Sequence, residues 1–160
     1  MRDFSANSRS IDGSKPSEAA LKHAVSLVKL AKTGKLVLLN LVQEVPLPPM
    51  MFESRMRSTR TGEETSVVAV WKELHQDMKF TSQKMLAEKK PEIEVLGVEV
   101  KTRVEVGHPP DRILAVAEEE DADLIVINNI GLFGFSKLMA IGSVSRTVSE
   151  KAKCLVLRVH

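Results

Sequence analysis

Residues 121–160 have the sequence DADLIVINNIGLFGFSKLMAIGSVSRTVSEKAKCLVLRVH, and this stretch decides the fold. The apolar run at 124–127 predicts a buried strand, glycines follow it, Ser143 opens a short helix, and residues 154–159 predict a last strand. A glycine-bearing loop between a strand and a helix offers backbone N–H groups and a helix N-terminus to an anion such as phosphate. The stretch therefore predicts an α/β fold and a candidate anion site.

Upstream of this stretch, helical and strand patterns alternate. Apolar residues recur at helical spacing over residues 16–33, and a longer helical pattern covers residues 66–90. Between them, residues 35–42 form an almost continuous apolar run, which is typical of a parallel strand covered on both faces. A strand at about 98–106 and a helix at about 110–120 complete the series. This alternation predicts a five-stranded parallel sheet with helices on both faces and a ligand crevice at its topological switch point.

Two segments depart from this simple pattern. Residues 4–11, where the first strand is expected, are mostly small and polar, and buried polar groups are costly unless they are paired. Residues 46–65 contain three prolines, several charges and no period, which predicts a flexible surface loop. The apolar side chains Met50, Met51 and Phe52 would let that loop serve instead as a flap over a ligand or a partner.

The long helix predicted at 66–90 carries one apolar stripe. Spacings of 4, 3, 4 and 7 residues separate the side chains Val67, Trp71, Leu74, Met78 and Met85. Core packing is the simplest explanation for this stripe, and its methionines need no cofactor to explain them.

Composition and charge are those of a globular domain. The 160 residues suffice for about one domain, with 43% hydrophobic and 28% charged residues. The 23 basic and 21 acidic residues are interspersed and give a net charge of +2, so nucleic acid is not an expected partner. No apolar run approaches the ~18 residues of a membrane span, and the N-terminus lacks a signal-peptide pattern. With Cys154 as its one cysteine, the chain is predicted to be cytoplasmic.

Catalytic motifs are missing from the sequence. The histidines at 23, 75, 108 and 160 lie on separate segments, and no Ser-His-Asp or Cys-His group can be proposed from spacing. The absence of a G-x-x-x-x-G-K-[ST] motif excludes P-loop chemistry. Asp12 has no acidic neighbour, whereas a phospho-receiver domain needs an acidic pair for Mg²⁺. An enzyme is therefore not the expected function.

Three segments resemble the universal stress protein family. They are DGSKPSEAA at 12–20, VEVGHPPDRILAVAEEEDADLIVI at 104–127 and GSVSRT at 142–147, and their order spans nearly the whole chain. The resemblance implies one domain over residues 1–160, with a Rossmann-like sheet of the adenine nucleotide alpha hydrolase type. The strand order that it implies is 3-2-1-4-5.

The ATP-binding members of that family carry G-x-x-G, nine residues, and then G-S or G-T. Glycines let the loop backbone approach phosphates, and the hydroxyl and helix N-terminus supply donors. Here Gly131 resembles the second glycine and Gly142-Ser143 the final pair, while Asn128 replaces the first glycine. Ten residues separate Gly131 from Gly142. A second register pairs Gly131 with Gly134 and leaves seven residues before Gly142.

The resemblance implies that ATP or AMP binds at the carboxyl end of the sheet, with Mg²⁺ or Mn²⁺ as the candidate metal on the phosphates, and that any ATP hydrolysis is slow. In the family, the Asp after the first strand contacts adenosine, and so does backbone near the end of the second strand. The implied binding positions here are Asp12, Leu41, Asn128, Gly131, Gly142, Ser143, Val144 and Ser145.

Dimer formation is a further implication of the resemblance. Val144 and the last strand, residues 155–159, resemble the family's dimer contact, where edge strands of two subunits pair antiparallel. A regulatory module that binds nucleotide is one hypothesis. The other is a dimeric family member that binds no stable nucleotide and acts through protein partners.

Overall fold

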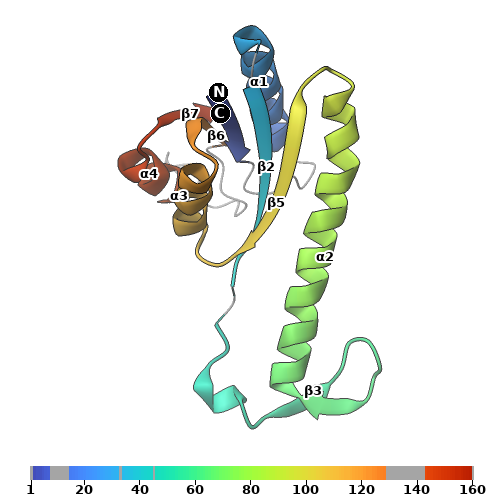
Figure 1. Ribbon diagram of the computed structural model, residues 1–160. Coiled ribbons are helices and arrows are strands. Elements are labelled where there is room, and N and C mark those ends of the chain that lie inside the picture. The colour runs from blue at the N-terminus through green and yellow to red at the C-terminus, as the bar shows by residue number, and fades with distance from the viewer. Residues whose placement is uncertain (1, 8–14, 33, 45, 129–142, 160) are drawn as a thin grey trace.

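A computed structural model describes residues 2–7, 15–32, 34–44, 46–128 and 143–159, with backbone alone for residues 2–7 and 15–17 (Figure 1). Three of the predicted binding residues, Asp12, Gly131 and Gly142, lie outside the described residues. So does Gly134 of the second register.

Five strands form one parallel sheet (Figure 1). They are β1 (Arg2–Asn7), β2 (Gly34–Val42), β5 (Glu99–Val106), β6 (Ala122–Asn128) and β7 (Leu155–Val159). Their order across the sheet is β5-β2-β1-β6-β7, and each neighbouring pair is parallel. The polar segment at the N-terminus thus supplies the central strand, and the predicted α/β class with parallel strands is confirmed.

Four helices cover the two faces of this sheet (Figure 1). They are α1 (Lys15–Ala31), α2 (Val67–Glu94), α3 (Pro109–Glu119) and α4 (Ser143–Lys151). One face, here called the α1/α2 face, packs against α1 and α2, and the opposite α3/α4 face packs against α3 and α4.

Alternate residues of each strand line the two faces. Leu36 and Leu38 of β2 lie in the core cluster on the α1/α2 face, whereas Val37 and Leu39 lie in the cluster on the α3/α4 face. This arrangement explains the continuous apolar run of β2, because a parallel strand covered on both faces has no side open to water.

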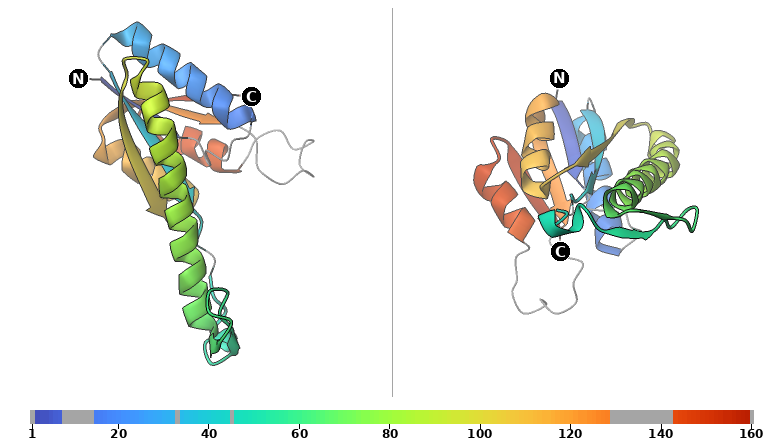
Figure 2. Two further views of the ribbon diagram at one scale, coloured as in Figure 1. Left: turned by 90° about the vertical axis from the view of Figure 1, so that its right-hand side faces the viewer. Right: turned by 90° about the horizontal axis from the view of Figure 1, so that it is seen from below.

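The prediction of core packing for the whole stripe on α2 is wrong. Leu74 is 53% exposed and Met78 is 36% exposed, Val67 and Trp71 are half-buried, and Met85 packs against the core from its edge. The N-terminal half of α2 extends beyond the end of the five-stranded sheet, so its stripe meets no strand of that sheet there (Figures 1 and 2). The side chains of α2 that are buried are Val70, Ser82, Leu86 and Ile93.

The segment 46–65 is not a loop without regular structure. It contains a short 3-10 helix, η1 (Pro49–Met51), and the strand β3 (Arg55–Arg57), which pairs antiparallel with β4 (Glu64–Ser66). Strands of three residues are too short to show a period of two, so the sequence pattern could not reveal them. The hairpin extends the protruding end of α2 (Figure 1).

Polar contacts tie this hairpin to α2. The Ser58 hydroxyl is buried, donates to the Glu73 carboxylate at 3.1 Å, and accepts from the backbone N–H groups of Arg60 and Thr61 at 3.1 and 3.2 Å. Arg60 also forms an ion pair with Asp77. The turn of the hairpin is therefore fixed against the first turns of α2.

Candidate functional site

After β1 the chain continues on one face of the sheet, and after β6 it continues on the opposite face. These strands are neighbours, yet β1 leads to α1 on one face and β6 leads to α4 on the other. In open α/β sheets, ligands bind outside the carboxyl ends of the strands at such a topological switch point. We call this place the switch point, and it is where the sequence places its candidate site.

Five of the predicted binding residues are described, and they lie near the carboxyl edge of the sheet. Leu41 is half-buried near the end of β2, and Asn128 is the last residue of β6. Ser143 is the exposed first residue of α4, while Val144 and Ser145 are buried in its first turn. Because the Val144 side chain packs in the core of the α3/α4 face, only its backbone is available to a ligand or to a partner subunit.

The first turn of α4 is suited to an anion. It contains no acidic residue, and the four N–H groups that begin an α-helix have no partner within the helix. The Ser143 carbonyl accepts from the Thr147 hydroxyl at 2.9 Å, and the Ser145 carbonyl accepts from the Ser149 hydroxyl at 2.7 Å. Both contacts use carbonyl oxygens, so neither of them occupies an N–H group at the start of the helix.

Asn128 contributes a buried polar group to the same edge. The residue is 9% exposed, and its Oδ1 has no hydrogen-bond partner among the described residues. Asn40 of β2, 4% exposed, is a second buried asparagine close to the carboxyl edge. The sequence argument did not select Asn40, although a polar residue inside the apolar run of β2 was the signal that could have found it.

A family model described as the universal stress protein family matches residues 10–160. The chain belongs to the universal stress protein family. It is 31% identical over 154 residues to universal stress protein YxiE of Bacillus subtilis, covering 94% of this chain and 95% of that protein. It is 29% identical over 148 residues to a universal stress protein of Methanocaldococcus jannaschii, covering 92% of this chain and 90% of that protein.

Solved structures of universal stress proteins have the same fold. UspA from Lactobacillus plantarum matches with a TM-score of 0.75 at 20% identity, over 100% of this chain and 99% of that chain. A universal stress protein in complex with cAMP matches with a TM-score of 0.61 at 24% identity, over 98% and 97% of the two chains. One from Archaeoglobus fulgidus in complex with dAMP matches with a TM-score of 0.60 at 21% identity, over 100% and 98%.

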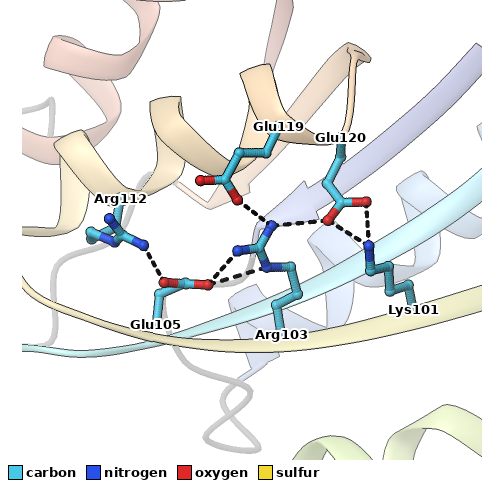
Figure 3. A network of polar contacts seen from close by, with 6 residues as sticks. All are labelled: Lys101, Arg103, Glu105, Arg112, Glu119 and Glu120. Carbon is cyan, nitrogen blue, oxygen red and sulfur yellow. Dashed lines mark hydrogen bonds and ion pairs between the residues drawn. The ribbon is translucent and has the colours of Figure 1, made fainter.

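This universal stress protein also has a charged network between β5 and α3 (Figure 3). Arg103 is its centre and lies 2.6 Å from Glu105, 2.7 Å from Glu119 and 2.9 Å from Glu120. Lys101 joins Glu120 at 2.7 Å, and Arg112 forms an ion pair with Glu105. Every charge in the network faces an opposite charge, so its role is to hold α3 against the edge strand β5.

The network shifts the pKa values of its carboxyl groups. Burial raises the pKa of Glu105, but hydrogen bonds from Arg112 and Arg103 outweigh burial, so its pKa lies below the ordinary value. The Lys101 hydrogen bond lowers the pKa of Glu120 against the effect of burial, and Arg103 lowers it further. Both carboxylates therefore stay charged at neutral pH and are poor proton donors or acceptors for catalysis.

Acid should weaken this protein partly through the network. Since the folded pKa values of Glu105 and Glu120 are lowered, their contribution is complete above the unfolded pKa of ~4.3 and is lost as the pH falls through the folded values. Urea unfolding between pH 7 and pH 3 should show this loss. Arg103→Met is expected to cost about 1–3 kcal/mol at pH 7 and to flatten the acid dependence.

Arg146→Met is the matched control, because the pair between Arg146 and Glu150 on α4 is 70% and 59% exposed. It should leave both the stability and its pH dependence unchanged. Equal effects of the two substitutions would contradict a structural role for the network.

A cavity of 310 Å³ lies at the opposite edge of the sheet, away from the switch point. The last residues of α3 and α4, the first residues of β6 and the half-buried Cys154 line it. Burial raises the pKa of the Cys154 thiol, so the thiol stays protonated and is a weak nucleophile. Two lysines and two acidic residues, Lys151, Lys153, Glu118 and Asp121, are among its lining residues, and α3 and α4 reach it with their C-terminal ends.

The described residues hold no candidate metal site and no candidate membrane-spanning helix. Within them, no cluster of three or more His, Cys, Asp or Glu side chains is arranged to hold a metal ion. None of the helices in that part of the chain is long and apolar enough to cross a membrane.

Proposed function

We propose that this universal stress protein is a cytoplasmic regulatory module that binds an adenine nucleotide, ATP or AMP, at the switch point. The observation that carries the proposal is that α4 begins with Ser143 at the carboxyl edge, on the opposite face from α1. A helix N-terminus placed there attracts phosphate. When only the strands of the parallel sheet are numbered along the chain, their order is 3-2-1-4-5. This is the order that the family resemblance implies, so it further supports the proposal.

The family relationship indicates what kind of anion to expect. Relatives of the same fold were solved in complex with cAMP and with dAMP, both of which are adenine nucleotides with one phosphate. We assign the phosphates to the Ser143 hydroxyl and to the backbone N–H groups at the start of α4. Mg²⁺ or Mn²⁺ would be held chiefly by the phosphates of the ligand and would offset part of their negative charge.

The remaining predicted residues complete this proposal. Asp12 and the backbone at Leu41 would contact the adenosine part, and Gly131 and Gly142 would let the chain approach the phosphates. Val144 and Ser145 would contribute backbone N–H groups. No reaction is proposed beyond slow ATP hydrolysis, and no nucleic-acid partner is proposed.

Gly142→Val tests the nucleotide site. Millimolar AMP or ATP with Mg²⁺ should raise the melting temperature of the natural protein, because a ligand that binds only the folded state stabilises it. GMP and GTP should have less effect. Adding a branched side chain next to Ser143 should abolish the shift while the ligand-free melting temperature changes little. If neither AMP nor ATP shifts the natural protein, the proposal is wrong.

A homodimer through β7 is the second part of the proposal. β7 is an edge strand, and Leu155 is 74% exposed and Leu157 is 37% exposed on it. Exposed apolar residues on an unpaired edge favour pairing with another strand. If nucleotide binding fails the test above, this edge favours the alternative of a dimer that acts through protein partners.

A further inference from the structure

A groove of 560 Å³ lies between the helices α1 and α2, and we call it the α1/α2 groove. Leu21 and Val25 of α1 line one side, and Ile93 of α2 lines the other, together with Leu96 two residues after that helix. Val25 and Ile93 are buried and belong to the core of the α1/α2 face, whereas Leu96 is 49% exposed. The groove therefore has an apolar floor that is fixed by the core, with a further apolar side chain open to water.

The charges on the α2 side of the groove neutralise one another. The Lys89 ammonium donates to the Glu92 carboxylate at 2.9 Å. This hydrogen bond raises the pKa of Lys89 against the effect of burial, and the charge of Glu18 on the α1 side raises it further. Both carboxylates that line the groove therefore act on the same lysine.

Two lysines on the α1 side lack such a partner. Lys22 and Lys29 both line the groove, both are exposed, and neither forms an ion pair with another of the described residues. Seven positions separate them, which corresponds to about two helical turns, or roughly 10.5 Å along the axis of α1. The α1 side of the groove therefore offers two uncompensated positive charges at a spacing set by the helix.

We propose that the α1/α2 groove docks an amphipathic helix of a partner protein. The apolar face of the partner helix packs on Val25, Ile93 and Leu96. Acidic side chains along one flank of it, seven positions apart, pair with Lys22 and Lys29. The groove is separate from the nucleotide site, because none of the residues proposed to bind nucleotide lines it.

The lining of the groove favours a helix over an extended peptide. An extended peptide gains affinity by pairing its main chain with a sheet edge, and none of the residues that line the groove belongs to a strand. Its backbone N–H and C=O groups would therefore stay unpaired above an apolar floor, which is costly. A helix satisfies its own backbone groups and presents only side chains to the groove.

A single alkyl chain is a poorer occupant than a helix. Small-ligand sites bury most of the ligand, whereas this groove is open to water along its lysine side and at Leu96. A fatty acid also carries only one carboxylate, which leaves one of the two lysines unpaired. Two positive charges about two turns apart, beside an apolar floor, correspond to the acidic flank and the apolar face of one amphipathic helix.

A designed peptide tests the inference with the full chain. It is an alanine-based, fluorescein-labelled helix of about 18 residues, with leucines at positions i, i+3, i+4 and i+7 and glutamates at two flank positions seven apart. Fluorescence anisotropy should show saturable binding with a Kd below about 100 μM. A second peptide, with lysine in place of both glutamates, should bind the natural protein at least about tenfold more weakly.

Lys22→Glu combined with Lys29→Glu reverses the charge on the α1 side. The glutamate peptide should bind this double variant about tenfold more weakly, and the lysine peptide about tenfold more tightly, than each binds the natural protein. Both lysines are exposed, so the melting temperature should change little. Leu96→Asp places a charge on the apolar part of the groove and should weaken both peptides about tenfold.

Lys72→Glu is the matched control for the lysine substitutions. Lys72 is an exposed lysine on the protruding half of α2 and does not line the groove. Its replacement changes the net charge by the same amount as either groove substitution, yet it should leave the affinities of both peptides unchanged. The control thus separates local pairing from attraction by the net charge of the protein.

The exchange of preference between the two peptides decides the test, because a loss of folding cannot produce a gain in affinity. A Kd above about 100 μM for the glutamate peptide would overturn the inference. So would a double variant that changes the affinity of neither peptide, or equal weakening by Lys72→Glu and Lys22→Glu. If laurate binds with dependence on Lys22 and Lys29 while the glutamate peptide does not bind, the groove takes an alkyl chain and the proposed partner is wrong.

Discussion

Leu86→Ala is expected to lower the free energy of unfolding by about 2–5 kcal/mol. Leu86 is 1% exposed and lies in the core cluster that joins α1, α2 and the sheet, so alanine would leave a cavity that rigid neighbours cannot fill. Urea unfolding of the purified protein measures this loss. Since Leu86 is not among the residues proposed to bind nucleotide, the folded variant should still bind adenine nucleotide.

Leu74→Ala is the matched control on the same helix. Leu74 is 53% exposed because its half of α2 extends beyond the sheet, so its truncation should change stability by less than about 0.5 kcal/mol. Equal losses at Leu74 and Leu86 would show that the N-terminal half of α2 is packed in the folded protein in solution. That result would contradict the protruding α2 described above.

Leu155→Lys is expected to convert the proposed dimer to a monomer. A lysine on the exposed edge strand β7 would add a positive charge to each subunit at the proposed interface and would oppose strand pairing. The association should therefore weaken at least about a hundredfold. Sedimentation or light scattering over a range of protein concentrations would measure the change. Leu155 is exposed in the single chain, so the variant should fold with little loss of stability.

Leu30→Lys is the control for exposure alone. Leu30 on α1 is 79% exposed, close to the 74% of Leu155, but it does not belong to an edge strand. Its replacement should leave the dimer intact. A natural protein that is monomeric at all concentrations, or a dimer that survives Leu155→Lys, would contradict the assignment to β7.

The sequence predicted those parts of the fold that depend on local pattern. The apolar runs of β2 and β6 and the spacing of α1 and α3 are strong signals, because burial on both faces of a sheet demands them. The helical spacing of apolar side chains on α2 does not reveal how far the sheet extends. The prediction that Leu74 and Met78 lie in the core is therefore wrong. An apolar stripe specifies a helix face, but only tertiary structure decides what covers that face.

The candidate site was predictable to a smaller extent. Ser143 and Asn128 could be selected because the resemblance to the family aligns motifs with them. Asn40 could not be connected with Asn128, since 88 positions separate them in the chain and only the register of β2, β1 and β6 places them in one row. Which atoms are buried without a partner is likewise a property of packing alone.

Backbone amide chemical shifts during an AMP titration test the central claim most directly. Nucleotide binding at the switch point predicts saturable shifts at Leu41, Asn128 and the first turn of α4, Ser143–Ser145. The N–H groups around Cys154, at the opposite edge, should not move. No shifts at millimolar AMP and ATP, or shifts confined to the edge near Cys154, would contradict the account.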